Sequence, residues 1–589
     1  MAQVSSQEEL QQALTNRAET IEVTGDFQIN SQVNIGYEVT ITSSPGTRTF
    51  ILQKTETYGS YMFRVNTGGT LRLRQITLDG NSISHPVEES TNRSLIYLYG
   101  GTLDIGSGAT LRNNNTDKEG GGVYLSGLET SPSQLIMSGD ATITGCHSNS
   151  SGGAIMAALR HADDRLFLSD TVKIRSNSAL NGGGIYFRSY LASLGGTLEI
   201  GSQVEISENS AVTAGGGIYI TGYLRDGEAG PPMYLILKDQ VNISSNSSLY
   251  GAGVHFHSVN SGSRMETRDS VVIQNNSASG SGGGIYLNGA QADISADLND
   301  TVIQNNTART GGGIYIRTDY GADVTLNRCT VSYNTAIDGN GGGIWNGVGT
   351  IGSRLTLSGG SVTANQAAIG GGLFNNQGST VSITGDTQFG IPLPNTATQL
   401  APGIYNAGVL NVQGDRMLQN GVYIRDRDSI VSITGALSPD SVIQLNTSNY
   451  VTPNPAGSPI VVGEATDGYP LLTERDAAAF RKPIEGFDGW EIQLSADRTQ
   501  VLLVHVIFHA LTYHANDDCC TPACGIPAPM MFQEGQDVTL SSLIPSRCCG
   551  CFVGWNTGKD GSGATYWPGS ILSAPDGDVN LYAQWRCSC

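Results

Sequence analysis

The chain has 589 residues, a formal net charge of −20, and only 14% charged residues. The negative charge excludes a nucleic-acid-binding protein, because binding to phosphates needs clustered Lys and Arg. No run of about 18 apolar residues occurs, so the sequence predicts no membrane-spanning helix. The 77 glycines do not follow the three-residue period of collagen, so they indicate turns or a longer repeat.

The N-terminus predicts a short amphipathic helix. Residues 5–15 combine a capping-box pattern, Ser6 with Glu9, with apolar residues at helical spacing, Leu10, Ala13 and Leu14. We expect residues 1–20 to form a capping helix that plugs one end of the fold. Met1 to Ser6 contain no apolar signal region, so the numbering describes either a cytosolic protein or a mature form.

Short alternating segments follow, and we expect strands at Ile21–Val23, Val39–Ile41 and Leu71–Leu78. From about residue 105 a repeat becomes obvious: two or three glycines, an aliphatic residue and then, usually, an aromatic residue. Ten copies occur with gaps of 29 to 36 residues. Their aliphatic residues are Val123, Ile155, Ile185, Ile218, Val254, Ile285, Ile314, Ile344, Leu373 and Ile404.

A second motif precedes each glycine run: an aliphatic residue, two variable residues and an asparagine. The asparagines are Asn114, Asn177, Asn209, Asn246, Asn276, Asn306, Asn334 and Asn365. Asparagine tolerates left-handed dihedral angles at a turn, and its amide can bond to the same residue of the next coil. We therefore expect an asparagine ladder. Cys146 replaces one of these asparagines and Cys329 takes an inward strand position, so both are expected to be small buried residues.

Strand, asparagine, short linker, glycines and strand together describe one coil of a solenoid. The linkers are too short for helical crossovers, and no segment of the repeat has a 3.6-residue period, which excludes an α-solenoid. We predict an all-β fold in which residues 21–450 form a right-handed, single-stranded parallel β-helix of the pectate-lyase-like type. Residues 451–505, with a helix at Glu474–Phe480, are expected to close the far end.

These motifs resemble those of bacterial surface β-helices, and are similar to the polymorphic outer-membrane repeat proteins, whose units carry Phe-x-x-Asn and Gly-Gly-Ala-Ile. Gly152, Gly153, Ala154 and Ile155 match the second motif, while the first has Ile or Val in place of Phe. The resemblance covers about residues 105–410. It implies an adhesin-like or passenger-like role.

One set of side chains is not required by the architecture. If Ile185 and Phe187 point inward, Tyr186 points outward, and the same alternation holds in each coil. The predicted outward aromatic column, with Met156 and His255 in two coils, consists of Tyr124, Tyr186, Tyr219, Tyr286, Tyr315, Trp345, Phe374 and Tyr405. Such rings could bind a glycan or a protein, or they could stack on one another beneath the loops.

Residues 506–589 differ in composition, and eight of the ten cysteines lie there: Cys519, Cys520, Cys524, Cys548, Cys549, Cys551, Cys587 and Cys589. This density favours a disulfide framework in an oxidising compartment. A metal site is the alternative. Free or intermolecular thiols, with Cys587 and Cys589 at the mobile end, are a third.

The same segment contains Gly554-Trp555-Asn556-Thr557 and closes with Leu581-Tyr582-Ala583-Gln584-Trp585. With Leu511 to Asn516 and Asp560 to Gly563, these residues resemble the Listeria–Bacteroides repeat, also called the internalin B-repeat type. The resemblance implies a small β-grasp-like module of a surface protein. Its members do not ordinarily carry this number of cysteines.

Parallel β-helices also include polysaccharide lyases and glycosidases, which need clustered acids. The strongest local cluster is His161, Asp163 and Asp164, followed by Arg165, and its position between coils favours solvated loop residues. We therefore expect no catalytic residue, no metal and no cofactor.

The leading hypothesis is a non-catalytic extracellular or cell-surface protein, adhesin-like or a scaffold, that binds a host or bacterial surface glycan or protein. The alternatives are a carbohydrate-active enzyme acting on polyuronates or other glycans, and a structural subunit that self-assembles through its C-terminal cysteines.

Overall fold

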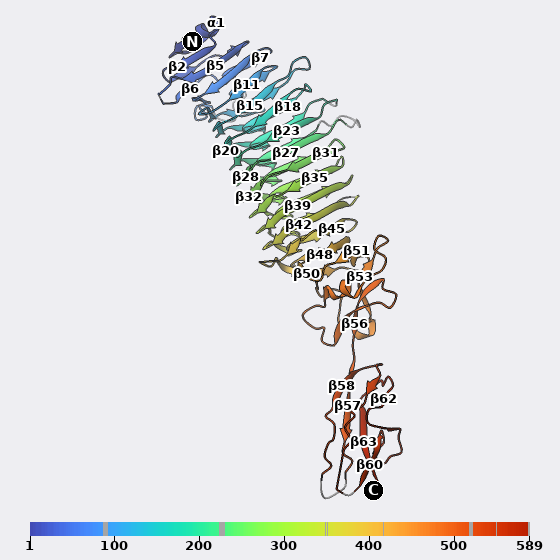
Figure 1. Ribbon diagram of the computed structural model, residues 1–589. Helices are drawn as coiled ribbons and strands as arrows, with labels where there is room; N and C mark the ends of the chain where they lie inside the picture. The colour runs from blue at the N-terminus through green and yellow to red at the C-terminus, as the bar shows by residue number, and fades with distance from the viewer. Residues whose placement is uncertain are drawn as a thin grey trace. The chain divides into compact units, whose positions relative to one another are not determined.

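The computed structural model describes residues 1–46, 48–85, 92–191, 193–222, 230–347, 349, 351–415, 417–517, 522–548 and 550–586. It contains an all-β parallel solenoid of about 13 turns (Figure 1). The chain divides into two compact units. The first comprises Met1–Thr452, Val462–Arg481 and Leu494–Gln500, and the second Pro453–Val461, Lys482–Gln493 and Val501–Cys589. Residues 451–505 therefore contribute to both.

Three strands of each coil join one sheet of 46 strands, and we name the three sides of the solenoid faces A, B and C. Face A carries the strands that follow the glycines. They are β4 (Val33–Ile35), β7 (Phe63–Asn66), β10 (Ile96–Tyr99), β14 (Val123–Ser126), β18 (Ile155–Leu159), β22 (Ile185–Ser189), β26 (Ile218–Thr221), β30 (Val254–His257), β34 (Ile285–Gly289), β38 (Ile314–Thr318), β41 (Ile344–Asn346), β44 (Leu373–Asn375), β48 (Ile404–Asn406) and the end of β50 (Met417–Ile424).

Face B follows face A along the chain in each coil. Its strands are β2 (Thr20–Val23), β5 (Glu38–Ser43), β8 (Thr70–Arg74), β11 (Thr102–Ile105), β15 (Gln134–Met137), β19 (Arg165–Leu168), β23 (Gly196–Ile200), β27 (Met233–Leu237), β31 (Ser263–Thr267), β35 (Ile294–Asn299), the first parts of β39 (Ala322–Ser332) and β42 (Ser353–Thr363), β45 (Thr380–Thr384), β49 (Val409–Gly414), β51 (Val431–Leu437) and β53 (Ile460–Ala465).

Face C carries the strands that contain the aliphatic residue of the asparagine motif, just before the asparagine. Its strands are β3 (Phe27–Ile29), β6 (Phe50–Lys54), β9 (Ile76–Asp79), β12 (Thr110–Arg112), β16 (Thr142–Thr144), β20 (Lys173–Arg175), β24 (Glu205–Ser207), β28 (Asn242–Ser244), β32 (Val272–Gln274), β36 (Val302–Gln304), the ends of β39 and β42, β46 (Gln388–Phe389), the start of β50, β52 (Val442–Leu445) and β54 (Phe480–Arg481).

Equivalent residues of successive coils pair in parallel and in register. On face A, Val254 pairs with Ile285, which pairs with Ile314, and all three are fully buried. Inward aliphatic residues therefore form continuous stacks along the solenoid, and their removal from water is the main force that holds the coils together.

The linkers between the asparagines and the glycines form a separate ten-stranded sheet, which the sequence reading did not foresee. The strands are β13 (Asn115–Thr116), β17 (His147–Ser151), β21 (Ser178–Asn181), β25 (Ser210–Ala214), β29 (Ser247–Tyr250), β33 (Ser277–Ser281), β37 (Thr307–Ala308), β40 (Thr335–Ala336), β43 (Gln366–Ile369) and β47 (Thr396–Leu400). Many of these segments are rich in Ser and Ala, which do not have the strand propensity of β-branched and aromatic residues.

The predicted asparagine ladder is present in the solenoid interior. Asn276 Nδ2 donates to Asn306 Oδ1 over 2.9 Å, and the same oxygen accepts the Asn276 backbone N–H over 3.0 Å. Asn276 Nδ2 also donates to the Ile243 carbonyl over 3.0 Å. These hydrogen bonds between side chains connect, in order, Asn177, Asn209, Asn246, Asn276, Asn306, Asn334, Asn365 and Asn395.

The left-handed residue of this corner is not the asparagine, as predicted, but the residue before it. Ser176, Glu208 and Asn275 have φ between 53° and 57°, and the asparagine that follows each is buried. The preceding residue turns the chain, so that the asparagine amide points inward. Sequence periodicity could not separate these two adjacent positions.

The glycine run makes the next corner, and two of its glycines have different functions. Gly282 has φ 71°, which side chains rarely tolerate. Gly283 lies so close to the next coil that a Cβ would stand 2.3 Å from the Gly312 carbonyl oxygen. Close backbone approach therefore explains why the motif repeats.

The N-terminal end is covered by the predicted helix, α1 (Gln7–Thr15), with Leu10 fully buried. A strand, β1 (Ala2–Val4), precedes it and pairs with β2. The capping box is only half formed: the Ser6 hydroxyl accepts the Glu9 N–H, but the Glu9 carboxylate accepts the Ser5 N–H. The expected strand Leu71–Leu78 is also divided, because Gln75 has φ 46° between β8 and β9.

The first unit ends in shorter elements. They are η1 (Arg427–Ser429) and α2 (Glu474–Ala478), a helix at the expected place whose cap Thr473 accepts the Asp476 N–H. Two further strands and a 3₁₀ turn lie wholly or largely in the second unit, namely η2 (Pro455–Gly457), β55 (Trp490–Leu494) and β56 (Gln500–His505).

The second unit contains a five-stranded sheet in the order β58, β57, β63, β60, β61. The strands are β57 (Phe508–His514), β58 (Met530–Gln533), β60 (Cys551–Asn556), β61 (Thr565–Tyr566) and β63 (Val579–Arg586), beside the two-stranded pair β59 (Val538–Thr539) and β62 (Ile571–Leu572). Trp555 is fully buried in its core and its ring centroid lies 4.8 Å from that of Tyr513. The likeness to a β-grasp module stays a prediction.

Candidate functional site

The predicted aromatic residues are brought together on the outer side of face A. Strand register places Tyr286 beside Tyr315 and Tyr315 beside Trp345. Their ring centroids lie 4.9 Å and 4.3 Å apart, and the Tyr315 and Trp345 rings are nearly parallel. The rings of neighbouring coils therefore contact one another, edge to face at Tyr286 and Tyr315 and face to face at Tyr315 and Trp345.

The aromatic column is longer than predicted, and one coil interrupts it. Tyr61 and Tyr97 extend it before Tyr124, and Tyr423 extends it after Tyr405, with centroid distances of 4.9 to 5.3 Å. The fully buried Met156 separates Tyr124 from Tyr186. The extra rings lie outside the glycine repeat, so the motif search missed them.

Burial divides the column into two classes of side chain. Tyr186, Tyr286 and Trp345 are almost fully covered, with Tyr186 only 8% exposed. The remaining predicted rings keep part of their surface in solvent: Tyr124, Tyr219, Tyr315, Phe374 and Tyr405. Desolvation raises the pKa of Tyr124, Tyr219 and Tyr315 well above the usual value. The column is thus partly architecture and partly an accessible surface.

Histidine occupies the column in one coil, where the His255 ring lies 5.0 Å from Tyr219 and 4.7 Å from Tyr286, between centroids. Burial lowers the pKa of His255 to about 3 and that of the neighbouring His257 to about 4. Both imidazoles are therefore neutral at physiological pH.

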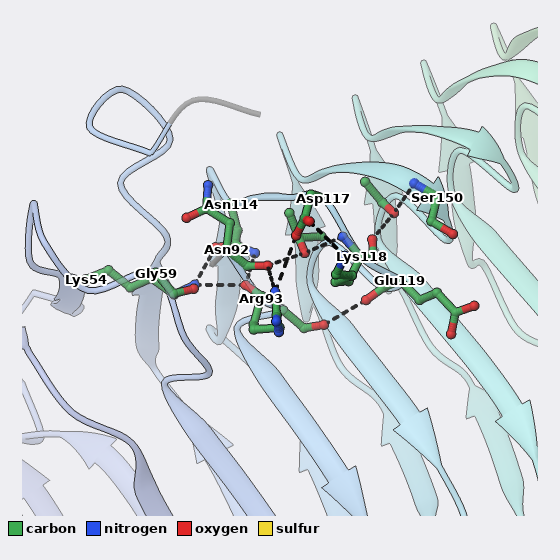
Figure 2. A network of polar contacts seen from close by, with 12 residues as sticks. Lys54, Gly59, Asn92, Arg93, Asn114, Asp117, Lys118, Glu119 and Ser150 are labelled. Atoms are coloured by element: carbon green, nitrogen blue, oxygen red, sulfur yellow. Dashed lines mark hydrogen bonds and ion pairs between the residues drawn. The ribbon is translucent and has the colours of Figure 1, made fainter. Parts of the chain in front are cut away.

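A polar network lies at the N-terminal end of the column and of the asparagine ladder (Figure 2). Lys54 is fully buried, and its Nζ donates to Asn114 Oδ1 over 2.8 Å and to the Arg93 carbonyl over 2.9 Å. Desolvation lowers the pKa of Lys54 to about 7. Asn114 Nδ2 in turn donates to the Gly121 carbonyl over 2.6 Å. In later coils the asparagine oxygen accepts a hydrogen bond from the preceding asparagine, whereas at Asn114 this bond comes from Lys54.

Charged groups of the same network border a cavity. Arg93 and Lys118 both pair with Asp117, over 3.3 Å and 2.9 Å. Together with Tyr61 and Tyr124 they line a cavity of about 510 Å³, in which Glu119 and Ser150 also take part. The accessible end of the aromatic column therefore offers ring surfaces beside groups of both charges.

The acidic cluster at His161, Asp163 and Asp164 has a structural function. Asp164 is buried, and its carboxylate accepts the backbone N–H groups of Ser133, Arg160 and His161 over 2.6 to 2.9 Å. These three hydrogen bonds occupy the acceptor positions of the carboxylate and fix the loop. Across the described ranges, no group of three or more His, Cys, Asp or Glu side chains could hold a metal ion, and none of the helices is long and apolar enough to cross a membrane.

A groove that the sequence reading missed lies on face B. It has a volume of about 680 Å³. Its floor is formed by β15, β19, β23 and β27, and the loops before β19, β23 and β27 provide Ala162, Ser193 to Gly195, and Pro231 with Pro232 as a wall. Phe167 and Tyr234 are 39% and 37% exposed there. The sequence contains one sign of this groove. Phe167 and Tyr234 each stand between two inward apolar residues of a strand, so alternation places both rings on the outside.

The cysteines are only partly described. Cys551 is disulfide-bonded, whereas Cys524 and Cys548 are exposed free thiols. Cys519, Cys520, Cys549, Cys587 and Cys589 lie outside the described residues. Cys146 and Cys329 are free and buried in the solenoid, as expected. A complete disulfide framework stays a prediction.

Residues 270–288 match the model of the Chlamydia polymorphic membrane protein repeat. The match contains Asn276, the glycines and Ile285-Tyr286, which together form the asparagine and glycine corners of one coil. No curated protein and no solved structure matches the chain. The matched stretch covers 19 residues, which is part of a single coil.

Proposed function

We propose that this chain is the non-catalytic, ligand-binding body of a bacterial surface protein, with an adhesin-like or scaffold role. The observation that carries the proposal is the match of the repeat unit to a repeat of membrane proteins. The same unit recurs along the solenoid, so each coil adds one more element to a long surface. A repeat protein of this type uses its extended face for binding.

The accessible rings of the aromatic column are the proposed contact surface for a glycan or protein. Tyr124 borders the 510 Å³ cavity, and Phe374 and Tyr405 stack with centroids 4.7 Å apart while remaining partly exposed. Aromatic surfaces of this kind bind partners through apolar contact and retain a polar edge at Tyr.

Attachment of beads coated with the full chain to cultured epithelial cells and to bacterial cells tests this role. We expect specific attachment that Phe374→Leu and Tyr405→Leu together reduce, because leucine preserves the packing but removes the ring faces. Tyr320→Leu, at an exposed tyrosine outside the column, is the control. Attachment equal to that of uncoated beads would contradict the proposed adhesive role.

Assembly through C-terminal cysteines is a second candidate, favoured by the exposed thiols of Cys524 and Cys548. On non-reducing gels we expect a ladder of multimers that collapses with thiol. A monomer in both lanes would contradict this role.

The absence of catalysis also stays a prediction, and release of products from polygalacturonate would overturn it.

A further inference from the structure

The face-B groove is a built site, because its walls are held by buried polar contacts. Asp164 fixes the first loop through three backbone N–H groups. The Ser189 hydroxyl contacts the Leu191 and Leu194 carbonyls over 2.9 Å and 2.7 Å. Asn260 Nδ2 donates to the Pro231 carbonyl over 2.7 Å. The described residues of the walls are therefore held by the fold itself, which lowers the cost of binding.

The floor combines aromatic rings with hydrogen-bonding groups. Strand register places Phe167 beside Glu199, and Thr197 beside Tyr234. Coils lie roughly 4.8 Å apart, so the strands that carry the two rings, two coils apart, are separated by roughly 10 Å. Gln134, Arg165 and Ser193 add donors and acceptors around the rings.

The electrostatics disfavour an anionic ligand. The Arg165 guanidinium already donates to the Ala162 and Asp164 carbonyls over 2.8 Å and 2.9 Å, and Glu199 pairs with Lys238 over 2.8 Å. The net charge of −20 repels anions over the whole chain. A protein partner would need roughly 800 Å² on each side, whereas this site is a narrow hollow.

We propose that the face-B groove binds a neutral oligosaccharide, with the apolar faces of two pyranose rings stacked on Phe167 and Tyr234. Sugar hydroxyls both donate and accept hydrogen bonds, which suits the mixed groups on the floor, and the volume is within the usual range for small-ligand sites. This inference rests on the proposed surface function and names the ligand class of a second site, separate from the aromatic column.

The test titrates the full chain by calorimetry with three probes: the hexamer of β-1,4-glucose, the hexamer of β-1,4-N-acetylglucosamine and the hexamer of α-1,4-galacturonate. We expect binding of at least one neutral hexamer and no binding of the acidic one. Phe167→Ala and Tyr234→Ala should each weaken binding roughly tenfold. Because both rings are exposed, the melting temperature should not change. Tyr320→Ala is the matched control.

Binding that survives both ring substitutions, preferential binding of the galacturonate hexamer, or failure of both neutral hexamers would overturn the inference. Cell attachment by the same variants separates this result from the proposed function. Attachment that persists in a chain unable to bind neutral hexamers contradicts the groove alone. Hexamer binding by a chain that attaches to no cell contradicts the adhesive role alone.

Discussion

At the scale of single residues, each ladder asparagine combines two functions in one side chain. Each amide bonds backward to a strand carbonyl and along the solenoid to the next asparagine. Since these groups are buried, their bonds replace hydration that is lost on folding. Cys146 occupies an asparagine position of the motif. Its backbone N–H still bonds to Asn177 Oδ1 over 3.0 Å, but its side chain cannot continue the ladder.

Replacing one ladder residue should therefore destabilise the solenoid. Asn276→Ala removes the acceptor for both the Asn246 backbone N–H and Asn246 Nδ2, and it removes the donor to the Ile243 carbonyl and Asn306. We expect a loss of about 3 kcal/mol, because buried groups left unpaired cost about 1–3 kcal/mol each. Thermal unfolding by circular dichroism measures it. Asn34→Ala, at an exposed position, should change the melting temperature little.

His255 predicts a loss of stability in acid. The pKa of His255 is about 3 in the folded chain, whereas an unburied histidine, as in the unfolded chain, has a pKa of 6.5. The unfolded chain therefore binds a proton first as the pH falls. The associated stability is complete above pH 6.5 and is lost as the pH falls toward 3, by a few kcal/mol at most. His255→Tyr, which restores the residue of neighbouring coils, should flatten the dependence of urea midpoints between pH 7 and pH 4. The partly exposed His147→Asn should retain the native acid sensitivity; equal slopes in all three proteins would exclude burial of His255 as the cause.

At the scale of elements, the glycine corner sets the spacing between coils. The second glycine of the motif leaves no space for a side chain, because its backbone lies against a carbonyl of the next coil. Gly283→Ala should cost about 2–4 kcal/mol, since the neighbouring backbone cannot move without separating the coils. Gly36→Ala is a matched control, because a Cβ there meets nothing within 4 Å. Urea titration of both variants measures the difference, and similar midpoints would contradict the close-approach explanation.

The elements that the sequence predicted are those whose signal is periodic. The Ile285 and Asn276 positions recur at nearly constant spacing, so the strands and the ladder could be read directly. The short strands such as β33 could not, because Ser and Ala give no alternating pattern and only stacking on equivalent coils orders them. A second ladder, Asn346 to Asn375 to Asn406 with bonds of 3.0 and 2.7 Å, also escaped notice. It occupies inward positions that hold apolar residues in earlier coils.

The sequence predicted which aromatic residues form the candidate site, but not how far each ring is exposed to solvent. Alternation placed Tyr286 and Tyr315 on the outer side of face A, and the strand register agrees. Whether such a ring meets solvent depends on the loops and on neighbouring rings, which differ from coil to coil. The groove at Phe167 and Tyr234 depends on three loops that come together only in the folded chain, so no linear motif announces it.

At the scale of the whole molecule, the two units are stabilised in different ways. The solenoid buries long aliphatic stacks, and its cysteines, Cys146 and Cys329, are free. The C-terminal sheet has a small core around Trp555 and contains the disulfide of Cys551. Small domains bury a smaller fraction of their apolar surface, so a disulfide contributes a large share of their stability, whereas a long solenoid gains a further interface with each coil.

Heating should therefore reveal two transitions, of which only one responds to a reductant. We expect calorimetry to show a large transition from the solenoid and a smaller one from the C-terminal sheet, because unfolding enthalpy scales with the number of residues. A phosphine reductant should lower the smaller transition by about 10 °C, since loss of a disulfide costs about 2–4 kcal/mol in a domain of this size. Cys551→Ser should lower the same transition without reductant. If the larger transition moved instead, the disulfide would be stabilising the solenoid, and the separation of the two cores would be wrong.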